Sequence, residues 1–292
     1  MKVYLTGANG QLGRAMNRVL SHDSVTIVNT EAPAIAEKCG MQALDITDVD
    51  EVMRAMRAEK PDVIVNCAAY TAVDRQESDI DLSYKINAIG ARNLAIASRE
   101  TGARLAHVST DYVFDGKGTR PYIEFDKTGP VSVYGKTKLA GEEFVRAFAD
   151  RYYILRTAWL YGDGNNFVKT MLRLSETHDE VSVVQDQVGT PTSAYELASA
   201  IRFLFTGDNY GIFHATCEGD CSWADFAEEI FTLAGKQTRV NRVSTAEYTA
   251  MNPQSATRPA YSILDNYMFR LTSDYRFADW HDAIRAYMED ET

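Results

Sequence analysis

The sequence predicts an α/β protein with a Rossmann-type, doubly wound parallel sheet and a smaller C-terminal α/β domain. Short β-branched runs alternate with amphipathic helical patterns over residues 1–160, as in a parallel sheet with right-handed crossovers. The first run, residues 2–6, leads directly into a glycine loop and then into a helix. After residue 160 the alternation loosens, which predicts a second domain interleaved with the first.

The elements of the first domain follow from these patterns. Helical spacing places Leu12, Ala15, Met16, Val19 and Leu20 on one side of the helix after the glycine loop. We expect further strands at residues 25–29, 42–46, 62–66, 104–109 and 152–157, and helices at 48–60, 79–101 and 130–149. The run at 62–66 is almost continuously apolar, as in a strand buried on both faces of a sheet.

The glycine loop contains Gly7, Gly10 and Gly13, between a strand and a helix. Glycine lets a backbone turn tightly and approach a pyrophosphate, and a helix N-terminus attracts its charge. This context favours dinucleotide binding over a plain turn. The second strand ends without a clearly placed acid, because Glu31 comes one step after Thr30. The cofactor is therefore NADPH or NADH, and NADPH is weakly favoured.

Tyr134 and Lys138 stand four residues apart in a helical segment, so they share one face. We expect the ammonium to lower the pKa of the phenol, which can then exchange a proton with a carbonyl oxygen. Thr110 follows a predicted strand and can bind the same oxygen. The small side chains Ala68 and Ala69 also follow a strand, and would let a cofactor lie against it. The alternatives are an accidental surface pair and a threonine that caps a turn.

The domain boundary is predicted near residue 160. Residues 1–160 form the dinucleotide-binding domain, and residues 161–292 form mainly a substrate-binding domain, with the helix at 193–206 packing back on the first. We expect helices at 166–175, 223–234 and 279–289 and strands at 181–184 and 211–215. Trp159 could wall a pocket or be a core aromatic. Arg258 could clamp a diphosphate or lie free on the surface.

Composition excludes several classes of protein. The net charge is −11 and no basic run is present, which disfavours nucleic-acid binding. No apolar run is long enough to span a bilayer, and the N-terminus lacks a signal peptide, so we expect a cytoplasmic protein that binds no membrane. Four cysteines, even with His214 near two of them, suggest neither a disulfide framework nor a metal site.

Several motifs together resemble one family. They are the glycine triplet, the strand end Ser109-Thr110-Asp111-Tyr112-Val113-Phe114-Asp115-Gly116 and Tyr134-x-x-x-Lys138. This set is similar to the extended short-chain dehydrogenases/reductases. Within them the chain resembles the dTDP-4-dehydrorhamnose reductases, through the blocks at residues 61–66, 134–142, 164–167, 186–192 and 258–259.

The resemblance implies a role for each matching residue. The pyrophosphate would be held by Gly7, Gly10, Gln11, Leu12 and Gly13. Asp45 and Ile46 would border the adenine, while Ala69, Tyr70 and Thr71 would line the nicotinamide side. Lys138 would bind the nicotinamide ribose, and Tyr134 would contact the cofactor as well as being the proton donor. The nucleotide sugar would meet Thr110, Asp111, Trp159, Asn166 and Arg258.

The implied reaction is reduction of the 4-keto group of dTDP-4-dehydro-L-rhamnose by a monomer or homodimer. Some members dimerise around a magnesium ion held by acids, but Ala15 replaces one ligand and Glu196 alone matches another, so we expect no metal. The alternatives are another nucleotide-sugar reductase, an epimerase or dehydratase of the same fold, or a non-catalytic regulatory subunit.

Overall fold

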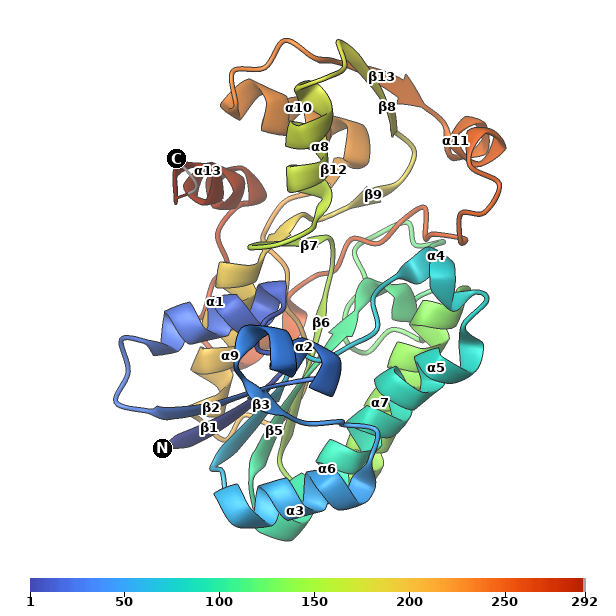
Figure 1. Cartoon of the computed structure of the whole chain (residues 1–292). Helices are drawn as coiled ribbons and strands as arrows, with labels where there is room; N and C mark the ends of the chain where they lie inside the picture. The colour runs from blue at the N-terminus through green and yellow to red at the C-terminus, as the bar shows by residue number, and fades with distance from the viewer. Residues whose placement is uncertain (291–292) are drawn as a thin grey trace.

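Seven parallel strands form the central sheet in this computed structural model, which describes residues 1–290 (Figure 1). Their spatial order is β11 (Gly211–His214), β6 (Tyr152–Thr157), β5 (Arg104–Thr110), β4 (Val63–Asn66), β1 (Lys2–Thr6), β2 (Thr26–Glu31) and β3 (Gln42–Ala43). Every neighbouring pair is parallel. All four residues of β4 are buried, which explains its apolar sequence. The predicted Rossmann-type sheet is therefore confirmed.

Helices cover both faces of this sheet (Figure 1). One apolar core lies beneath α1 (Gln11–Leu20), α9 (Ala194–Phe205) and α12 (Tyr267–Thr272). A second core lies beneath α3 (Val49–Glu59), α6 (Ala91–Thr101) and α7 (Val133–Phe148). The carboxyl ends of the strands consequently meet along one edge, between the sheet and the smaller lobe, where ligands of such folds bind.

Several sequence-based boundaries were wrong. The third strand ends at Ala43, because the Thr47 amide donates to the Asp45 carboxylate and turns the chain toward α3, which Asp48 caps. The expected helix over 79–101 is three pieces: α5 (Ile80–Tyr84), a π-helical segment η1 (Lys85–Gly90) and α6. Two short helices in the first 80 residues were also not expected: α2 (Pro33–Cys39) and α4 (Val73–Gln76).

The π-helical segment carries a buried asparagine. Asn87 Nδ2 donates to the Tyr70 carbonyl over 3.1 Å and to Thr137 Oγ1 over 3.1 Å, and its Oδ1 accepts from the Tyr70 amide. Such bulges are frequent at functional sites. Here Asn87 ties the loop after β4 to helix α7.

The smaller lobe, seen above the sheet in Figure 1, has its own apolar core. Its elements are β7 (Leu160–Tyr161), α8 (Phe167–Ser175), β8 (Glu180–Val184), β9 (Val188–Gly189), β10 (Thr192–Ser193), β12 (Cys221–Ser222), α10 (Trp223–Leu233), β13 (Arg239–Val243), α11 (Thr245–Met251) and α13 (Trp280–Asp290). The second half of the chain also supplies β11, α9 and α12 to the sheet layers, and α9 packs on α1. We propose a division in which residues 1–160 with these three elements bind the dinucleotide.

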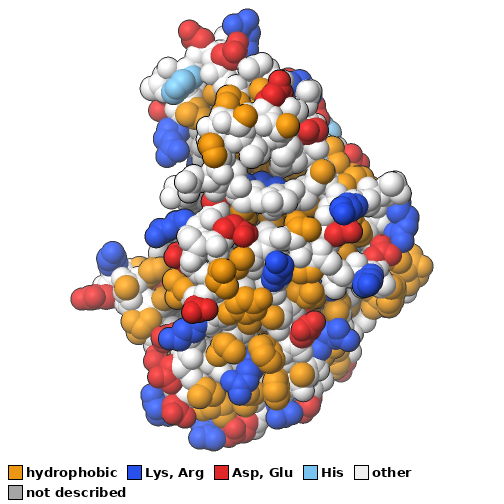
Figure 2. Space-filling model, turned by 90° about the vertical axis from the view of Figure 1, so that its right-hand side faces the viewer, with side chains coloured by type: hydrophobic (Ala, Val, Ile, Leu, Met, Phe, Trp, Pro, Cys, Tyr) orange, Lys and Arg blue, Asp and Glu red, His pale blue; other side chains and the backbone are white. Residues whose placement is uncertain are grey.

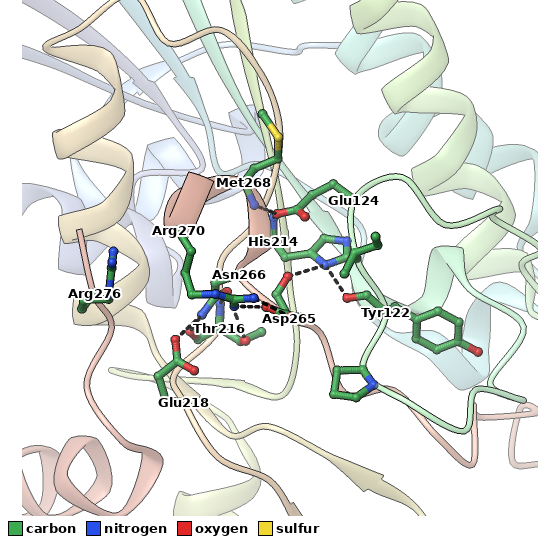
Figure 3. A network of polar contacts seen from close by, with 12 residues as sticks. Tyr122, Glu124, His214, Thr216, Glu218, Asp265, Asn266, Met268, Arg270 and Arg276 are labelled. Carbon is green, nitrogen blue, oxygen red and sulfur yellow. Dashed lines mark hydrogen bonds and ion pairs between the residues drawn. The ribbon is translucent and has the colours of Figure 1, made fainter. Parts of the chain in front are cut away.

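A polar network fastens the returning C-terminal segment to the edge strand β11 (Figure 3). The Glu124 carboxylate accepts from the backbone amides of His214 and Met268. The His214 ring lies 3.0 Å from the Tyr122 carbonyl oxygen, and burial lowers its pKa to about 3. This histidine is therefore neutral and structural.

The described residues hold no group of three side chains that could ligate a metal ion. All four cysteines are free thiols. Within residues 1–290, no helix has both the length and the apolar character required to cross a membrane.

Candidate active site

The glycine loop allows backbone segments to approach one another closely. Gly7 has φ +64°, and a Cβ on Gly13 would lie 2.3 Å from the Gly7 carbonyl oxygen. The Gly10 amide donates to that same carbonyl over 3.1 Å, and Gly10 is the N-cap of α1. The loop thus needs small residues at these positions and presents the N-terminus of α1, which attracts anions.

A cavity of about 420 Å³ opens beside this loop. It is lined by seven of the predicted cofactor residues, Gly7, Gly10, Asp45, Ile46, Ala68, Ala69 and Tyr70. Thr71 is exposed and does not line it, and the Leu12 side chain is buried in the core below α1. The Gln11 Oε1 atom is buried and has no hydrogen-bond partner among the described residues.

Besides the predicted Asp45, the cavity is lined by a second acid, Glu31, which the sequence analysis did not place in the site. Strand β2 continues to Glu31, whose carboxylate is almost buried and accepts from the backbone amides of Asn9 (3.0 Å) and Ala32 (3.1 Å). An acid at the end of the second strand is placed to bind the adenosine ribose and to repel a 2′-phosphate. The signal was present in the sequence, but the strand was expected to end two residues earlier.

Tyr134 lies at the start of α7, close to the turn that follows β5. Ser132 caps the helix, and a Cβ on Gly135 would lie 2.2 Å from the Tyr112 carbonyl oxygen, so the helix begins in contact with that turn. The rings of Tyr134 and Tyr112 pack edge to face at 5.3 Å. One helical turn later Lys138 is buried, and its Nζ donates to the Val108 carbonyl over 2.6 Å.

The expected pKa of Tyr134 was wrong. Burial raises the pKa of this phenol to about 12, a hydrogen bond with Thr110 opposes that rise, and the Asp111 charge adds to it. Burial also lowers the pKa of Lys138 to about 8, against the opposing charge of Glu142. The phenol is thus neutral and protonated near neutral pH, and Lys138 titrates about one pH unit above it.

Thr110 and Asp111 form a buried pair beside Tyr134. The Thr110 hydroxyl donates to Asp111 Oδ1 over 2.8 Å and accepts from the Tyr112 amide over 3.2 Å. The second Asp111 oxygen is buried without a partner in the described part of the chain, and burial raises the pKa of this carboxyl to about 6. A hydroxyl has one proton, so Thr110 must leave Asp111 in order to donate to another oxygen.

Aromatic rings gather where the chain enters the smaller lobe. Trp159 has φ +46°, a conformation that bulky residues rarely adopt, and it stacks on Trp223 with ring centroids 3.6 Å apart. Phe167 packs against Trp223 in turn, at 4.6 Å. Trp223 was expected only as part of a helix, and no local pattern in the sequence links it to Trp159.

The other two predicted substrate residues have protein partners. The Asn166 amide donates to the carbonyls of Gly162 and Gly164, and its oxygen caps α8 at the Lys169 amide. Arg258 forms an ion pair of 2.9 Å with Asp74, which also accepts from the Ala256 amide. Arg258 thus joins the loop before residue 260 to α4 on the sheet domain.

Figure 2 shows that one face of the molecule is hollowed between the upper and the larger lower lobe. The sequence-predicted groups divide between these lobes. The glycine loop, Thr110, Tyr134 and Lys138 belong to the sheet domain, whereas Trp159, Asn166 and Arg258 come from the connection and the smaller lobe. The arrangement is suited to donating a proton to an oxygen atom that is held beside a bound dinucleotide.

The chain is similar in sequence to a known protein family and to individual members of it. Residues 1–292 match the family model described as RmlD substrate binding domain. The spore coat polysaccharide biosynthesis protein SpsK of Bacillus subtilis (strain 168) is 40% identical over 292 residues, covering 100% of this chain and 98% of that protein.

Two solved structures are also similar over their full length. The dTDP-4-dehydrorhamnose reductase of Clostridium acetobutylicum superimposes with a TM-score of 0.93 at 50% identity, covering 100% of this chain and 99% of the other. The enzyme of that name from Bacillus anthracis, solved in complex with NADP, has a TM-score of 0.92 and 41% identity, with 99% of both chains covered.

Proposed function

The chain belongs to the RmlD family, that of the dTDP-4-dehydrorhamnose reductases, and from this premise we propose that it reduces the 4-keto group of dTDP-4-dehydro-L-rhamnose to give dTDP-L-rhamnose. The enzyme is an NAD(P)H-dependent oxidoreductase. The observation that carries the proposed reaction is the hydrogen bond between Tyr134 and Thr110, one helical turn from the buried Lys138, at the same edge of the sheet as the cavity of the glycine loop.

The cavity fits a dinucleotide. A Cβ on Gly7 or Gly13 would collide with backbone atoms of the neighbouring segments, so glycine at both positions keeps the loop close to the strand ends. The N-terminus of α1 would then meet the pyrophosphate. The residues that would hold the cofactor are Gly7, Gly10, Gln11, Gly13, Glu31, Asp45, Ile46, Ala68, Ala69, Tyr70, Tyr134 and Lys138. When bound, the reduced nicotinamide supplies the hydride.

Tyr134 acts as the proton donor of the reaction. Its raised pKa keeps the phenol protonated at neutral pH, which is the form that a reduction requires. Negative charge develops on the keto oxygen, and the Tyr134 and Thr110 hydroxyls stabilise it by hydrogen bonding. The protonated Lys138 then favours the phenolate that remains after proton transfer.

The sugar nucleotide would lie against residues from both lobes. Asp111 lies beside Thr110 and can bind a sugar hydroxyl through its unpartnered oxygen. Trp159, backed by Trp223, offers an apolar wall. Arg258 can exchange Asp74 for a diphosphate, because a guanidinium binds two oxygens at once.

The test is an absorbance assay of the reduced nicotinamide with dTDP-4-dehydro-L-rhamnose, run once with NADPH and once with NADH. We expect stoichiometric oxidation of the cofactor and formation of dTDP-L-rhamnose. Conversion of the sugar without net oxidation would indicate an epimerase, because an epimerase recycles its cofactor. Cofactor binding with no conversion would favour a regulatory subunit. Either result would overturn the proposal.

A further inference from the structure

One buried ion pair lies directly behind the candidate catalytic residues. Glu142 on α7 and Arg156 on β6 are 1% and 3% exposed. Arg156 donates to both carboxylate oxygens, from Nε over 2.9 Å and from Nη2 over 2.7 Å. The Ser109 hydroxyl donates to the same carboxylate. A buried charge pair is costly unless its geometry is good, and this one is bidentate with a third donor.

The position of Glu142 connects this pair to Lys138. Tyr134, Lys138 and Glu142 follow one another at four-residue intervals on α7, so they form one row along the helix. The row faces consecutive residues of β5: Lys138 donates to the Val108 carbonyl, and Glu142 accepts from Ser109. The next residue along β5 is Thr110. The same contacts therefore hold the helix of the phenol against the strand of the threonine.

Apart from Glu142, few negative charges lie near the buried Lys138 ammonium. Among residues 1–290 it makes one hydrogen bond to protein, although an ammonium has three donors. The titratable or charged groups of the elements packed around it are Tyr134 and Glu142 of α7, Cys67 after β4, His107 of β5 and, behind Glu142, Arg156 of β6; Asp111 of η2 (Asp111–Val113) lies farther along, beside Tyr134.

Three of these groups carry no charge near neutral pH. Burial raises the pKa of the Cys67 thiol and lowers the pKa of His107 well below its ordinary value, so both are neutral. Tyr134 is protonated, and the Asp111 charge raises the pKa of this phenol and that of Tyr112. Glu142 is the acid whose charge opposes the burial of Lys138.

We propose that Glu142 is a positioning residue of the reductase: held by Arg156 and Ser109, its carboxylate supplies the counter-charge of the Lys138 ammonium and locks α7 on β5. This proposal rests on the proposed function only in that Lys138 binds the cofactor and assists Tyr134. The Glu142–Arg156 ion pair would then have an electrostatic role in addition to stabilising the packing of α7 on the sheet.

The test compares Glu142→Gln with Glu143→Gln, an exposed carboxylate at the next position of the same helix. Two quantities are followed from pH 6 to pH 10: the Kd of the reduced cofactor, from nicotinamide fluorescence without sugar, and kcat/KM for the sugar. Loss of a nearby opposite charge shifts a pKa by about 1 unit or more. In Glu142→Gln we expect cofactor binding and kcat/KM to weaken about one pH unit lower than in the wild type. Glu143→Gln should follow the wild type.

A second variant separates the electrostatic task from packing. Glu142→Gln leaves Arg156 as an unpaired buried charge, whereas Glu142→Gln combined with Arg156→Gln leaves none. The double variant should shift both pH profiles in the same direction by a smaller amount, because the repulsion from Arg156 is also gone. It decides the matter if the single variant does not fold.

The proposal would be overturned if the folded variants kept the wild-type pH midpoints and lost cofactor affinity or kcat/KM equally at every pH. The Glu142–Arg156 pair would then have only a structural role. The fluorescence titration needs no sugar turnover. Failure of the proposed reaction in the wild type is therefore distinguishable from failure of this inference.

Discussion

The two sides of the site are held in place by different means. On the cofactor side, the geometry comes from backbone: Gly7 and Gly13 let loop, strand and helix approach to distances that a Cβ would block. On the substrate side, it comes from side chains that meet across the lobes, such as the Trp159–Trp223 stack and the Arg258–Asp74 ion pair. Substitutions at the glycines of the cofactor side should thus abolish or strongly weaken cofactor binding. Substitutions on the substrate side should lower the affinity for the sugar nucleotide by smaller amounts that depend on the contact removed.

Gly13→Ala, on the cofactor side, should have the largest effect of the substitutions that test this difference. The new Cβ would lie 2.3 Å from the Gly7 carbonyl oxygen and 2.6 Å from two Ala8 atoms, all of them backbone. Overpacking of this kind costs about 1–3 kcal/mol, and here it displaces the loop itself, so we expect cofactor affinity to fall roughly 100-fold or more. Fluorescence titration and thermal unfolding measure both effects.

Gly207→Ala is the matched control, because the nearest atom to its new Cβ is 3.8 Å away. It should bind cofactor like the wild type. If Gly13→Ala also bound with the wild-type Kd, the backbone account of the cofactor side would be wrong.

Arg258→Ala should have a smaller effect and one confined to the substrate. A charge-assisted hydrogen bond contributes about 1.5–3 kcal/mol, which predicts a KM for the sugar nucleotide raised about 10- to 100-fold. The Kd of the cofactor should be unchanged. Steady-state kinetics with both ligands varied measure the two constants.

Arg285→Ala serves as its control, since Arg285 is exposed on α13 and pairs with Asp282 of the same helix. Equal effects of Arg258→Ala on sugar and cofactor would show that the 256–258 loop stabilises the whole cleft and is not specific to the substrate.

Glu31→Gln should give the smallest effect, a change in the ratio of the two cofactors. The carboxylate lies in the cofactor cavity, where it repels a 2′-phosphate. The amide keeps the shape and loses the charge, so kcat/KM for NADPH relative to NADH should rise roughly five- to tenfold, given about 1 kcal/mol for a screened charge pair.

Glu37→Gln, on the exposed side of α2, removes a charge of the same kind nearby and should leave the ratio unchanged. An unchanged ratio in Glu31→Gln as well would mean that another group selects the cofactor.

The same contrast explains what the sequence could predict. The glycine loop and the Tyr134–Lys138 pair are local patterns, and alternating strands and helices bring their positions to one sheet edge. The pair Arg258–Asp74 is 184 residues apart, and the Trp159–Trp223 contact joins two lobes, so no local pattern encodes them. The Tyr134 pKa depends on burial, which spacing does not reveal, and the ammonium that was expected to lower it is engaged by the Val108 carbonyl.

Tyr134→Phe is the measurement that tests the central claim most directly. The variant keeps the ring and its packing on Tyr112 but removes the proton that the keto oxygen receives. Tyr152→Phe is the control, because Tyr152 is the first residue of β6 and lies at the end of that strand away from the site. General acid catalysis contributes about 10²- to 10⁴-fold, so turnover of dTDP-4-dehydro-L-rhamnose should fall by about 10³-fold while the Kd of the cofactor stays at its wild-type value. Turnover within a few fold of the wild type, with cofactor still bound, would contradict the account and require another proton donor.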